Sequence, residues 1–252
     1  MNRLAGKVAI VTGASKGIGA GIATAFAADG ARVAVNYSSD NAGAERVVQT
    51  IIDNGGEAIA VGADVSKAAE VARLFKEVDS AFGRLDVLVN NAGVFRFGAF
   101  AGITEENFHL HYNINVLGPI LTTQQAIKHF GPDGGSIINL SSIVGSNPIP
   151  GALLYASTKG AIETLTRGLA LELAPRKIRV NGISPGHTET EGNVAAGTFE
   201  GGAGAALAAK TPLGRLGRVT DIAPLAVFLA SDESAWITGE IIRASGGLIV
   251  AA

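Results

Sequence analysis

Short runs of apolar residues, many of them β-branched, recur along the chain and alternate with longer segments of mixed polarity. Runs of this length that are bounded by glycine or polar residues are typical of strands buried in a parallel sheet. They predict seven strands, at residues 8–11, 32–37, 58–61, 85–89, 136–140, 179–184 and 240–243.

The segments between these runs predict helices. The clearest carries a stripe at spacings of three and four residues from Leu154 to Leu173, as an amphipathic helix does. Further helices are predicted from the glycine-rich turn to about residue 29, at about 42–54, from about 67, at 105–112, at 116–130 and at 219–230.

Strand and helix alternate from residue 7 to residue 243, without a linker or an internal repeat. This order predicts an α/β fold with one doubly wound, mostly parallel, seven-stranded sheet of the Rossmann type and helices on both faces. We therefore expect residues 1–252 to form a single dinucleotide-binding and catalytic domain.

Residues 191–210 interrupt this pattern. They contain many Gly and Ala residues and one aromatic residue, Phe199. Such a segment packs weakly and moves readily, so we predict a substrate lid at about 190–212. A disordered surface insertion is the alternative.

Composition limits the classes of function. Apolar residues make up 47% of the chain, charged residues 17%, and the net charge is −2. This balance provides no basic surface for nucleic acid or for a membrane. The chain has no Cys, which excludes disulfides, thiolate catalysis and Cys-ligated zinc. No stretch approaches the ~18 apolar residues of a membrane span, and we expect a soluble, cytoplasmic protein.

The four histidines show no metal-ligand spacing, and no metal site is expected. His109, His111 and His129 are interpreted as surface or helix residues. His187 follows the sixth strand, next to the expected edge of the active site.

A glycine-rich turn lies between the first strand and the first helix, with glycines at positions 13, 17 and 19. Glycines let a backbone turn tightly and approach a ligand, and a helix N-terminus offers free N–H groups to phosphate. The spacing differs from the common Gly-x-Gly-x-x-Gly fingerprint, and a turn that merely packs helix on strand is the alternative. As a cofactor site it would use Gly13, Ser15, Lys16, Gly17, Ile18 and Gly19.

The end of the second strand is where a dinucleotide fold meets the adenosine ribose. NAD-preferring sites usually carry an acidic side chain there. This chain instead has Tyr37, Ser38 and Ser39, whose hydroxyls suit a 2′-phosphate, and Lys16 adds positive charge. The sequence therefore favours NADP(H) and leaves NAD(H) possible, with an ordinary polar loop as the alternative.

Polar residues also follow the later strands, at the edge where open α/β sheets place their chemistry. Asp64, beside Val65, either accepts a bond from an adenine amino group or caps the next helix. The segment Asn91, Ala92 and Gly93 either approaches a cofactor or forms an Asx turn. Ser142 follows the fifth strand.

Tyr155 and Lys159 lie four residues apart on a predicted helix and therefore share one face. A free phenol has a pKa of about 10, and a cation within about 4–6 Å lowers it. We therefore predict that Lys159 lowers the pKa of Tyr155 and makes it a general acid–base. A solvated helix face is the alternative reading of this spacing.

Four pieces occur in one order: the turn with Gly13, Gly17 and Gly19, the segment from Asn90 to Gly93, Ser142, and the pair Tyr155 and Lys159. Together they resemble the short-chain dehydrogenase/reductase family, in its short single-domain branch. The resemblance covers essentially the whole chain. It is closest to oxoacyl-carrier-protein-reductase-like and general ketoreductase enzymes, although Asp133 stands where carrier-protein reductases tend to be basic.

The resemblance implies a catalytic tetrad. Tyr155 would protonate the carbonyl oxygen, Lys159 would hold the nicotinamide ribose, and Ser142 would bind the substrate oxygen. Asn115 matches the family's Asn-x-x-Gly and would hold a water, with Asn113 as a near neighbour. It also implies cofactor contacts by Pro185, Gly186, Thr188 and Thr190, the last two toward the carboxamide.

The resemblance implies an NADP-dependent carbonyl reductase or alcohol dehydrogenase that acts on a small ketone or secondary alcohol. The largely apolar substrate loops suggest a modest hydrophobic substrate. An NAD-dependent dehydrogenase of a sugar, steroid or polyol is the alternative, and a catalytically silent cofactor sensor is a further one. Family members usually form homotetramers through the helices that precede and carry the Tyr motif and through the C-terminal strand.

Overall fold

The computed structural model describes residues 2–195 and 197–248. Its central feature is a seven-stranded sheet in the order β3-β2-β1-β4-β5-β6-β9, and every pairing in it is parallel. The strands are β1 (Val8–Val11), β2 (Arg32–Tyr37), β3 (Glu57–Gly62), β4 (Val87–Asn90), β5 (Gly135–Leu140), β6 (Ile178–Pro185) and β9 (Ile241–Ala244). The predicted doubly wound Rossmann-type fold is confirmed.

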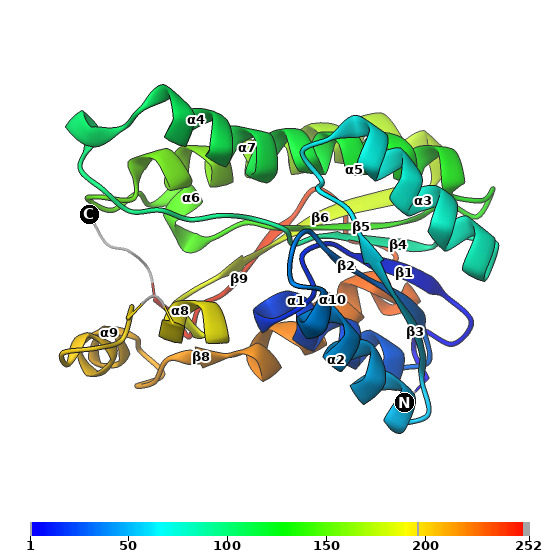
Figure 1. Cartoon of the computed structure of the whole chain (residues 1–252), viewed down its shortest axis with the longest axis horizontal. Helices are drawn as coiled ribbons and strands as arrows, with labels where there is room; N and C mark the ends of the chain where they lie inside the picture. Colours follow the sequence, from blue (N-terminus) through cyan, green and yellow to red (C-terminus); the bar gives the residue numbers. More distant parts are fainter. Residues whose placement is uncertain (1, 196, 249–252) are drawn as a thin grey trace.

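Helices cover both faces of this sheet (Figure 1). One layer contains α1 (Gly17–Ala28), α2 (Asn41–Asp53) and α10 (Val219–Ala230). The opposite layer contains α3 (Ala68–Phe82), α5 (Gly118–His129) and α7 (Leu153–Leu173), with α4 (Glu105–Tyr112) beyond its end.

Alternate residues of the central strands supply the two apolar layers. In β1, Ala9 and Val11 pack in the layer that contains Phe26 of α1, whereas Val8 and Ile10 pack in the opposite layer. All five side chains are fully buried. Burying a side chain of the size of Ile or Phe stabilises a fold by about 1.5–3 kcal/mol, so this sandwich holds the carboxyl edge of the sheet rigid.

Some element boundaries differ from the prediction. The strand predicted at 85–89 is β4 at Val87–Asn90, because Leu85 instead makes an isolated bridge with Phe130. A short helix, α6 (Ile143–Ser146), begins directly after Ser142 where a loop was expected.

The helices predicted at 105–112 and 116–130 are one continuous helical segment. A π-helical turn, Asn113–Leu117, joins α4 to α5 and contains Asn115. Single π turns inside helices occur frequently at functional sites. The turn is followed by Gly118, where an added Cβ would lie 2.8 Å from Cγ2 of Val65, so glycine permits α5 to approach the end of β3.

The predicted lid has secondary structure of its own. It carries α8 (Glu191–Ala195) and α9 (Ala203–Lys210), so its described residues differ from the disordered surface insertion that was the alternative to a lid. Its base is closed by a parallel pair of two-residue strands, β7 (Thr188–Glu189) and β8 (Gly217–Arg218). In Figure 1 these elements lie together at the carboxyl edge of the sheet.

Within the described residues, no helix combines the length and the apolar character that crossing a membrane requires.

Candidate active site

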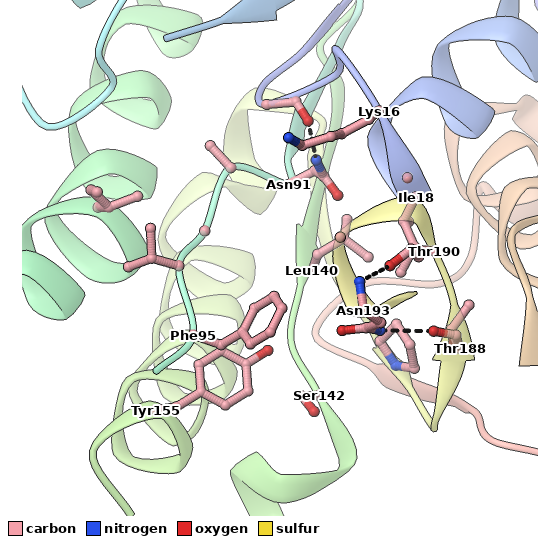
Figure 2. Close-up of a pocket in the computed structure, with 18 of the residues that line it drawn as sticks. Lys16, Ile18, Asn91, Phe95, Leu140, Ser142, Tyr155, Thr188, Thr190 and Asn193 are labelled. Atoms are coloured by element: carbon pink, nitrogen blue, oxygen red, sulfur yellow. Dashed lines mark hydrogen bonds between the residues drawn. The ribbon is translucent and has the colours of Figure 1, made fainter. Parts of the chain in front are cut away.

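A cavity of about 790 Å³ opens at the carboxyl ends of the parallel strands (Figure 2). It runs from the glycine-rich turn after β1 to the helix that carries Tyr155. The predicted site residues that line it are Gly13, Ser15, Lys16, Gly17, Ile18, Tyr37, Ser38, Ser39, Asp64, Val65, Asn91, Ala92, Gly93, Ser142, Tyr155, Lys159, Pro185, Gly186, Thr188 and Thr190.

Two amide side chains hold the glycine-rich turn in shape. Asn36, at the end of β2, accepts a hydrogen bond from the Gly13 N–H over 3.2 Å, and its own amide bonds to carbonyls at the end of β3. Asn91, after β4, donates to the carbonyls of Thr12 and Gly13 over 2.8 and 2.9 Å. The turn is therefore fixed by three neighbouring strands before any ligand binds.

Gly13 and Gly19 lie at positions where any larger residue would clash with the segment after β4. Gly13 has φ of +61°, and an added Cβ would lie 2.8 Å from the Cα of Ala92. At Gly19 a Cβ would lie 2.4 Å from the amide nitrogen of Asn91. Gly19, predicted to contact a cofactor, is buried outside the cavity lining, where it lets α1 pack against the segment after β4.

A positively charged and a negatively charged side chain lie close to the end of β2. Nζ of Lys16 lies 3.8 Å from a carboxylate oxygen of Asp40, and the Lys16 side chain is 59% exposed. Asp40 also accepts a hydrogen bond from the Gly43 N–H and caps α2. This acidic residue was not among the predicted site residues, because it lies beyond the strand and its capping role is visible only in the folded chain.

Asp64 does not cap the helix that follows it. Its carboxylate accepts bonds from the backbone N–H and the hydroxyl of Ser66, over 3.0 and 2.7 Å. The predicted capping role is therefore wrong, and α3 begins after Lys67 without a side-chain cap. Hydrogen bonds from Ser66 keep the pKa of Asp64 below its usual value although burial opposes them.

Tyr155 and Lys159 lie on the first turns of α7, facing the cavity. Nζ of Lys159 is 5.5 Å from the centroid of the Tyr155 ring and donates to the Leu140 carbonyl over 2.7 Å. Ser142, the residue before α6, points into the same space, as Figure 2 shows. The rings of Phe95 and Phe97 approach that of Tyr155 edge-on, at 6.2 and 6.4 Å between centroids.

The prediction that Lys159 lowers the pKa of Tyr155 is wrong. Burial raises the pKa of Tyr155 to about 12, and a hydrogen bond with Ser142 only partly opposes this. Burial also lowers the pKa of Lys159 to about 8. The physical reason is placement, since the ammonium group lies over the ring and bonds to a carbonyl instead of pointing at the phenolic oxygen.

Asn115 is buried behind the cavity rather than lining it. Its Oδ1 accepts from the Val94 N–H over 2.8 Å, and its Nδ2 donates to the Val94 carbonyl over 2.9 Å and to the hydroxyl of Thr158 over 3.1 Å. Asn113 is exposed. Asn115 therefore connects the π turn, the segment after β4 and α7.

The amino end of the lid contacts the glycine-rich turn. Asn193 donates to the Thr188 carbonyl over 2.8 Å, and its N–H bonds to the hydroxyl of Thr190 (Figure 2). Glu191 accepts a hydrogen bond from the Gly17 N–H over 2.9 Å. A lid carboxylate thus occupies the N-terminus of α1, where an anionic ligand would bind. This contact was not predicted, and its only signal in the sequence is an acidic residue directly after Thr190.

The cavity also receives residues that the sequence placed only approximately. His187 lines it, and burial lowers the pKa of its imidazole. Phe199 and Leu207 reach it from the lid, and Ile149 from the segment before α7. Among the residues described, no three His, Asp or Glu side chains form a group that could hold a metal ion.

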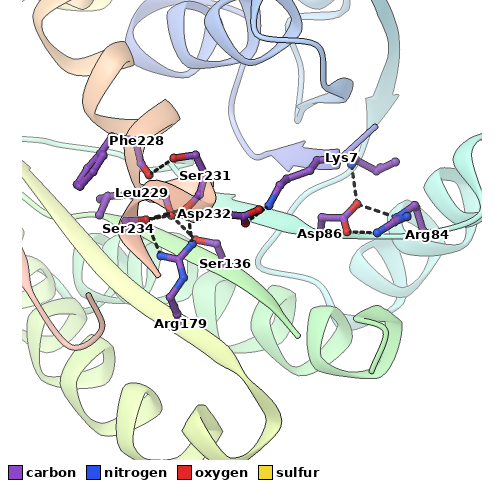
Figure 3. A network of polar contacts seen from close by, with 11 residues as sticks. Lys7, Arg84, Asp86, Ser136, Arg179, Phe228, Leu229, Ser231, Asp232 and Ser234 are labelled. Carbon is purple, nitrogen blue, oxygen red and sulfur yellow. Dashed lines mark hydrogen bonds and ion pairs between the residues drawn. The ribbon is translucent and has the colours of Figure 1, made fainter. Parts of the chain in front are cut away.

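The opposite edge of the sheet carries a polar network (Figure 3). Lys7 pairs with Asp232 over 2.7 Å, Asp86 accepts from the Val8 N–H over 2.8 Å, and Arg179 donates to the hydroxyl of Ser234 over 2.8 Å. The bonds of Lys7 and Arg179 join the amino ends of β1 and β6 to the segment after α10, and the bond of Asp86 joins β1 to the amino end of β4. We interpret this network as structural.

Comparison with known proteins agrees with this geometry. Residues 13–249 match the family model described as enoyl-(acyl carrier protein) reductase. An uncharacterized oxidoreductase of Methylorubrum extorquens is 54% identical over 248 residues, which cover 98% of this chain and 100% of that protein. A hydroxynaphthalene reductase-like protein of Metarhizium majus is 40% identical over 257 residues, covering 98% and 96%.

Solved structures share the whole fold. A short chain dehydrogenase from Burkholderia cenocepacia in complex with NADP is 39% identical and superposes with a TM-score of 0.92. The match covers 98% of this chain and 99% of that one.

Proposed function

Because this chain belongs to the short-chain dehydrogenase/reductase family of oxidoreductases, we propose that it transfers hydride between NADP(H) and a ketone or secondary alcohol. The observation that carries the proposal is that one cavity is lined both by a glycine-rich turn of the type that binds phosphate and by Ser142 and Tyr155, which carry hydroxyl groups. Residues 1–252 would act as one dinucleotide-binding and catalytic domain, with 190–212 as the lid.

The residues present fit a dinucleotide. Gly13 and Gly17 adopt positive φ, which exposes backbone N–H groups at the N-terminus of α1, and the Gly17 N–H already binds a carboxylate. Asp64 and Val65 would flank the adenine. Asn91 to Gly93, Pro185, Gly186, Thr188 and Thr190 would hold the nicotinamide half.

The bound nicotinamide cofactor would supply the hydride. Tyr155, with a pKa of about 12, keeps its proton at neutral pH and can donate it to a carbonyl oxygen as negative charge develops there. Ser142 would donate a second hydrogen bond to the same oxygen. Lys159 would turn from the Leu140 carbonyl toward the ribose hydroxyls, and Asn115 would hold a water on the path that resupplies the proton.

Several observations support NADP(H) as the cofactor. The Burkholderia relative binds NADP, and Lys16, Tyr37, Ser38 and Ser39 line the cavity where a 2′-phosphate would lie. Asp40 favours the NAD-dependent alternative, because a carboxylate near the ribose repels a phosphate. Its hydrogen bond to the N-terminus of α2 and its pairing with Lys16 reduce that repulsion.

The proposal is tested by cofactor consumption with NADPH and NADH in parallel against aryl ketones, β-keto esters, aliphatic ketones and an acetoacetyl thioester. We expect turnover that is faster with NADPH. Replacing Lys16 with alanine should lower kcat/KM for NADPH about tenfold and leave NADH nearly unchanged, because one phosphate contact is lost. Faster turnover with NADH would contradict the cofactor assignment. Tight cofactor binding without turnover of any carbonyl compound would instead favour the alternative that the protein is a catalytically silent cofactor sensor.

The substrate class follows from the lining and from one relative. Phe95, Phe97, Ile149 and Phe199 make the substrate half of the cavity apolar. The Metarhizium relative is named for reduction of a hydroxynaphthalene, which is a fused aromatic compound. We therefore place aryl ketones first in the panel.

Assembly and location belong to the same proposal. Phe108 on α4 and Leu171 on α7 are large apolar side chains that are 42% and 80% exposed, and Trp236, shortly before β9, is fully exposed. These are the elements through which a homotetramer was predicted. We propose a cytoplasmic homotetramer that binds neither nucleic acid nor membrane.

The contact between Glu191 and Gly17 predicts a measurable effect on cofactor affinity. The carboxylate must leave the Gly17 N–H before a phosphate can bind there. Replacing Glu191 with alanine should therefore lower the Kd for NADP about three- to tenfold, measured by fluorescence titration. Glu189→Ala removes the same charge from an exposed neighbouring position and should leave the Kd unchanged. An equal effect of both variants would show that only net charge matters.

A further inference from the structure

Residues 94–98, in the segment after β4, are held by hydrogen bonds to the backbone of alternate residues. The backbone of Val94 is bonded in both directions by Asn115. The Arg96 N–H donates to Nε2 of His111 over 3.1 Å. The Gly98 N–H donates to the Gly151 carbonyl over 2.8 Å.

The residues between these bonded positions are Phe95 and Phe97, and both line the cavity together with Val94, whereas Arg96 and Gly98 do not. Their rings lie 5.9 Å apart between centroids and each approaches the ring of Tyr155 edge-on. Phe95 is 38% and Phe97 59% exposed, so each keeps free ring surface beside the phenol that would donate the proton. Figure 2 shows Phe95 next to Tyr155. We call these two residues the aromatic wall.

His111 holds the middle of this segment. It lies on α4, in agreement with its interpretation as a surface or helix residue, and it is fully buried. Its Nδ1 lies 2.8 Å from the Asn107 carbonyl and its Nε2 accepts from Arg96. Both bonds require the neutral imidazole with its proton on Nδ1. The same turn of α4 also binds the Arg96 guanidinium through Oδ1 of Asn107 over 3.2 Å.

We propose that His111 is a positioning residue that fixes the aromatic wall beside Tyr155, so that the site selects ketones that carry an aromatic ring over aliphatic ketones of similar size. This inference rests on the proposed ketoreductase function of the same cavity. His111 itself does not line the cavity, so it acts through the 94–98 segment. Edge-to-face and offset contacts between aromatic rings contribute binding free energy beyond that of the buried area. This contribution depends on the relative orientation of the rings, so Phe95 and Phe97 must be held in a fixed position.

The test compares 2-tetralone with 2-octanone in His111→Leu, His111→Gln and the wild-type protein. Leucine removes the acceptor for the Arg96 N–H, whereas the Oε1 of glutamine can replace it. We expect KM for 2-tetralone to rise about fivefold in His111→Leu with kcat nearly unchanged, and KM for 2-octanone to change less than about twofold. His111→Gln should restore most of the preference for the aromatic ketone.

A matched control comes from the same helix. His109 is exposed and lies beside Glu105, so His109→Leu should behave as wild type. Equal losses for both ketones in His111→Leu would show a general structural role and overturn the proposal, as would an unchanged preference. If His111→Leu does not fold, the Phe95→Leu and Phe97→Leu variants carry the test, and retention of the wild-type preference in both would overturn the aromatic wall.

A binding measurement separates this proposal from the proposed function. Calorimetric titration of the complex with NADP by 2-naphthol requires no turnover. We expect about fivefold weaker binding to His111→Leu than to the wild type and recovery in His111→Gln. Turnover of 2-octanone by the wild type without any preference for aromatic ligands would overturn the positioning role and leave the ketoreductase function intact. Selective binding of 2-naphthol without turnover of any ketone would overturn the ketoreductase function and leave the positioning role of His111 intact.

Discussion

Replacing Tyr155 with phenylalanine is expected to lower kcat for carbonyl reduction by about 10²–10⁴, because the variant keeps the ring and loses the proton donor. The ring packs against Phe95 and Phe97, and these contacts remain in the variant. The Kd for NADPH should therefore stay within about twofold of the wild-type value. Steady-state kinetics and a fluorescence titration of the same preparation measure both quantities.

Tyr112 provides the matched control. Its hydroxyl donates to Ser157 on the outer side of α7, outside the cavity lining. Tyr112→Phe makes the same chemical change and should retain wild-type turnover. If Tyr155→Phe keeps more than a small fraction of activity, Tyr155 is not the general acid.

Replacing Lys159 with methionine should lower turnover and should change how the free energy of unfolding depends on pH. Turnover should fall by about 10²-fold or more, because the cation that holds the ribose is lost. The folded chain holds the pKa of Lys159 at about 8, against 10.5 for a free lysine, because its ammonium is buried. Between pH values of about 8 and 10.5, Lys159 is largely protonated in the unfolded chain and largely deprotonated in the folded chain. The free energy of unfolding therefore rises as pH rises through this window.

Chemical denaturation of the cofactor-free protein at pH 8 and pH 10 measures this effect. The wild type should gain about 2 kcal/mol in the free energy of unfolding relative to Lys159→Met over this range. The upper limit avoids the titration of Tyr155, whose raised pKa would act in the opposite sense above about 10. Lys76→Met, at an exposed position, should follow the wild-type pH dependence. An identical pH dependence for Lys159→Met would show that the buried ammonium does not control stability.

The sheet was predictable because each buried strand leaves a direct signature of short β-branched runs bounded by glycine. That signature also fixed the edge on which Ser142, Asn91 and the glycine-rich turn converge, since parallel strands end together. The cavity could therefore be located from the sequence almost residue by residue. Gly19 and Asn115 were the exceptions, and for Gly19 the reason is that a glycine needed for close packing and one needed for ligand approach look the same in a sequence.

The details that escaped prediction depend on contacts between segments far apart in the chain. Lys159 bonds to the Leu140 carbonyl, and this partner decides where its charge points. His111 is buried because the 94–98 segment lies over α4. Glu191 reaches the Gly17 N–H only because β7 and β8 pair at the base of the lid. None of these pairings has a local sequence signature.

The strand order also determines when the proposed cofactor site forms during folding. The first strand of the chain, β1, lies in the middle of the sheet and can pair with β2 and β3 as soon as these have been synthesised. Its other side waits for β4, and Asn91, which follows β4, supplies the bonds to Thr12 and Gly13. Parallel pairing over such sequence distances is slow. The proposed dinucleotide site is therefore completed late, when the second half of the sheet docks onto the first.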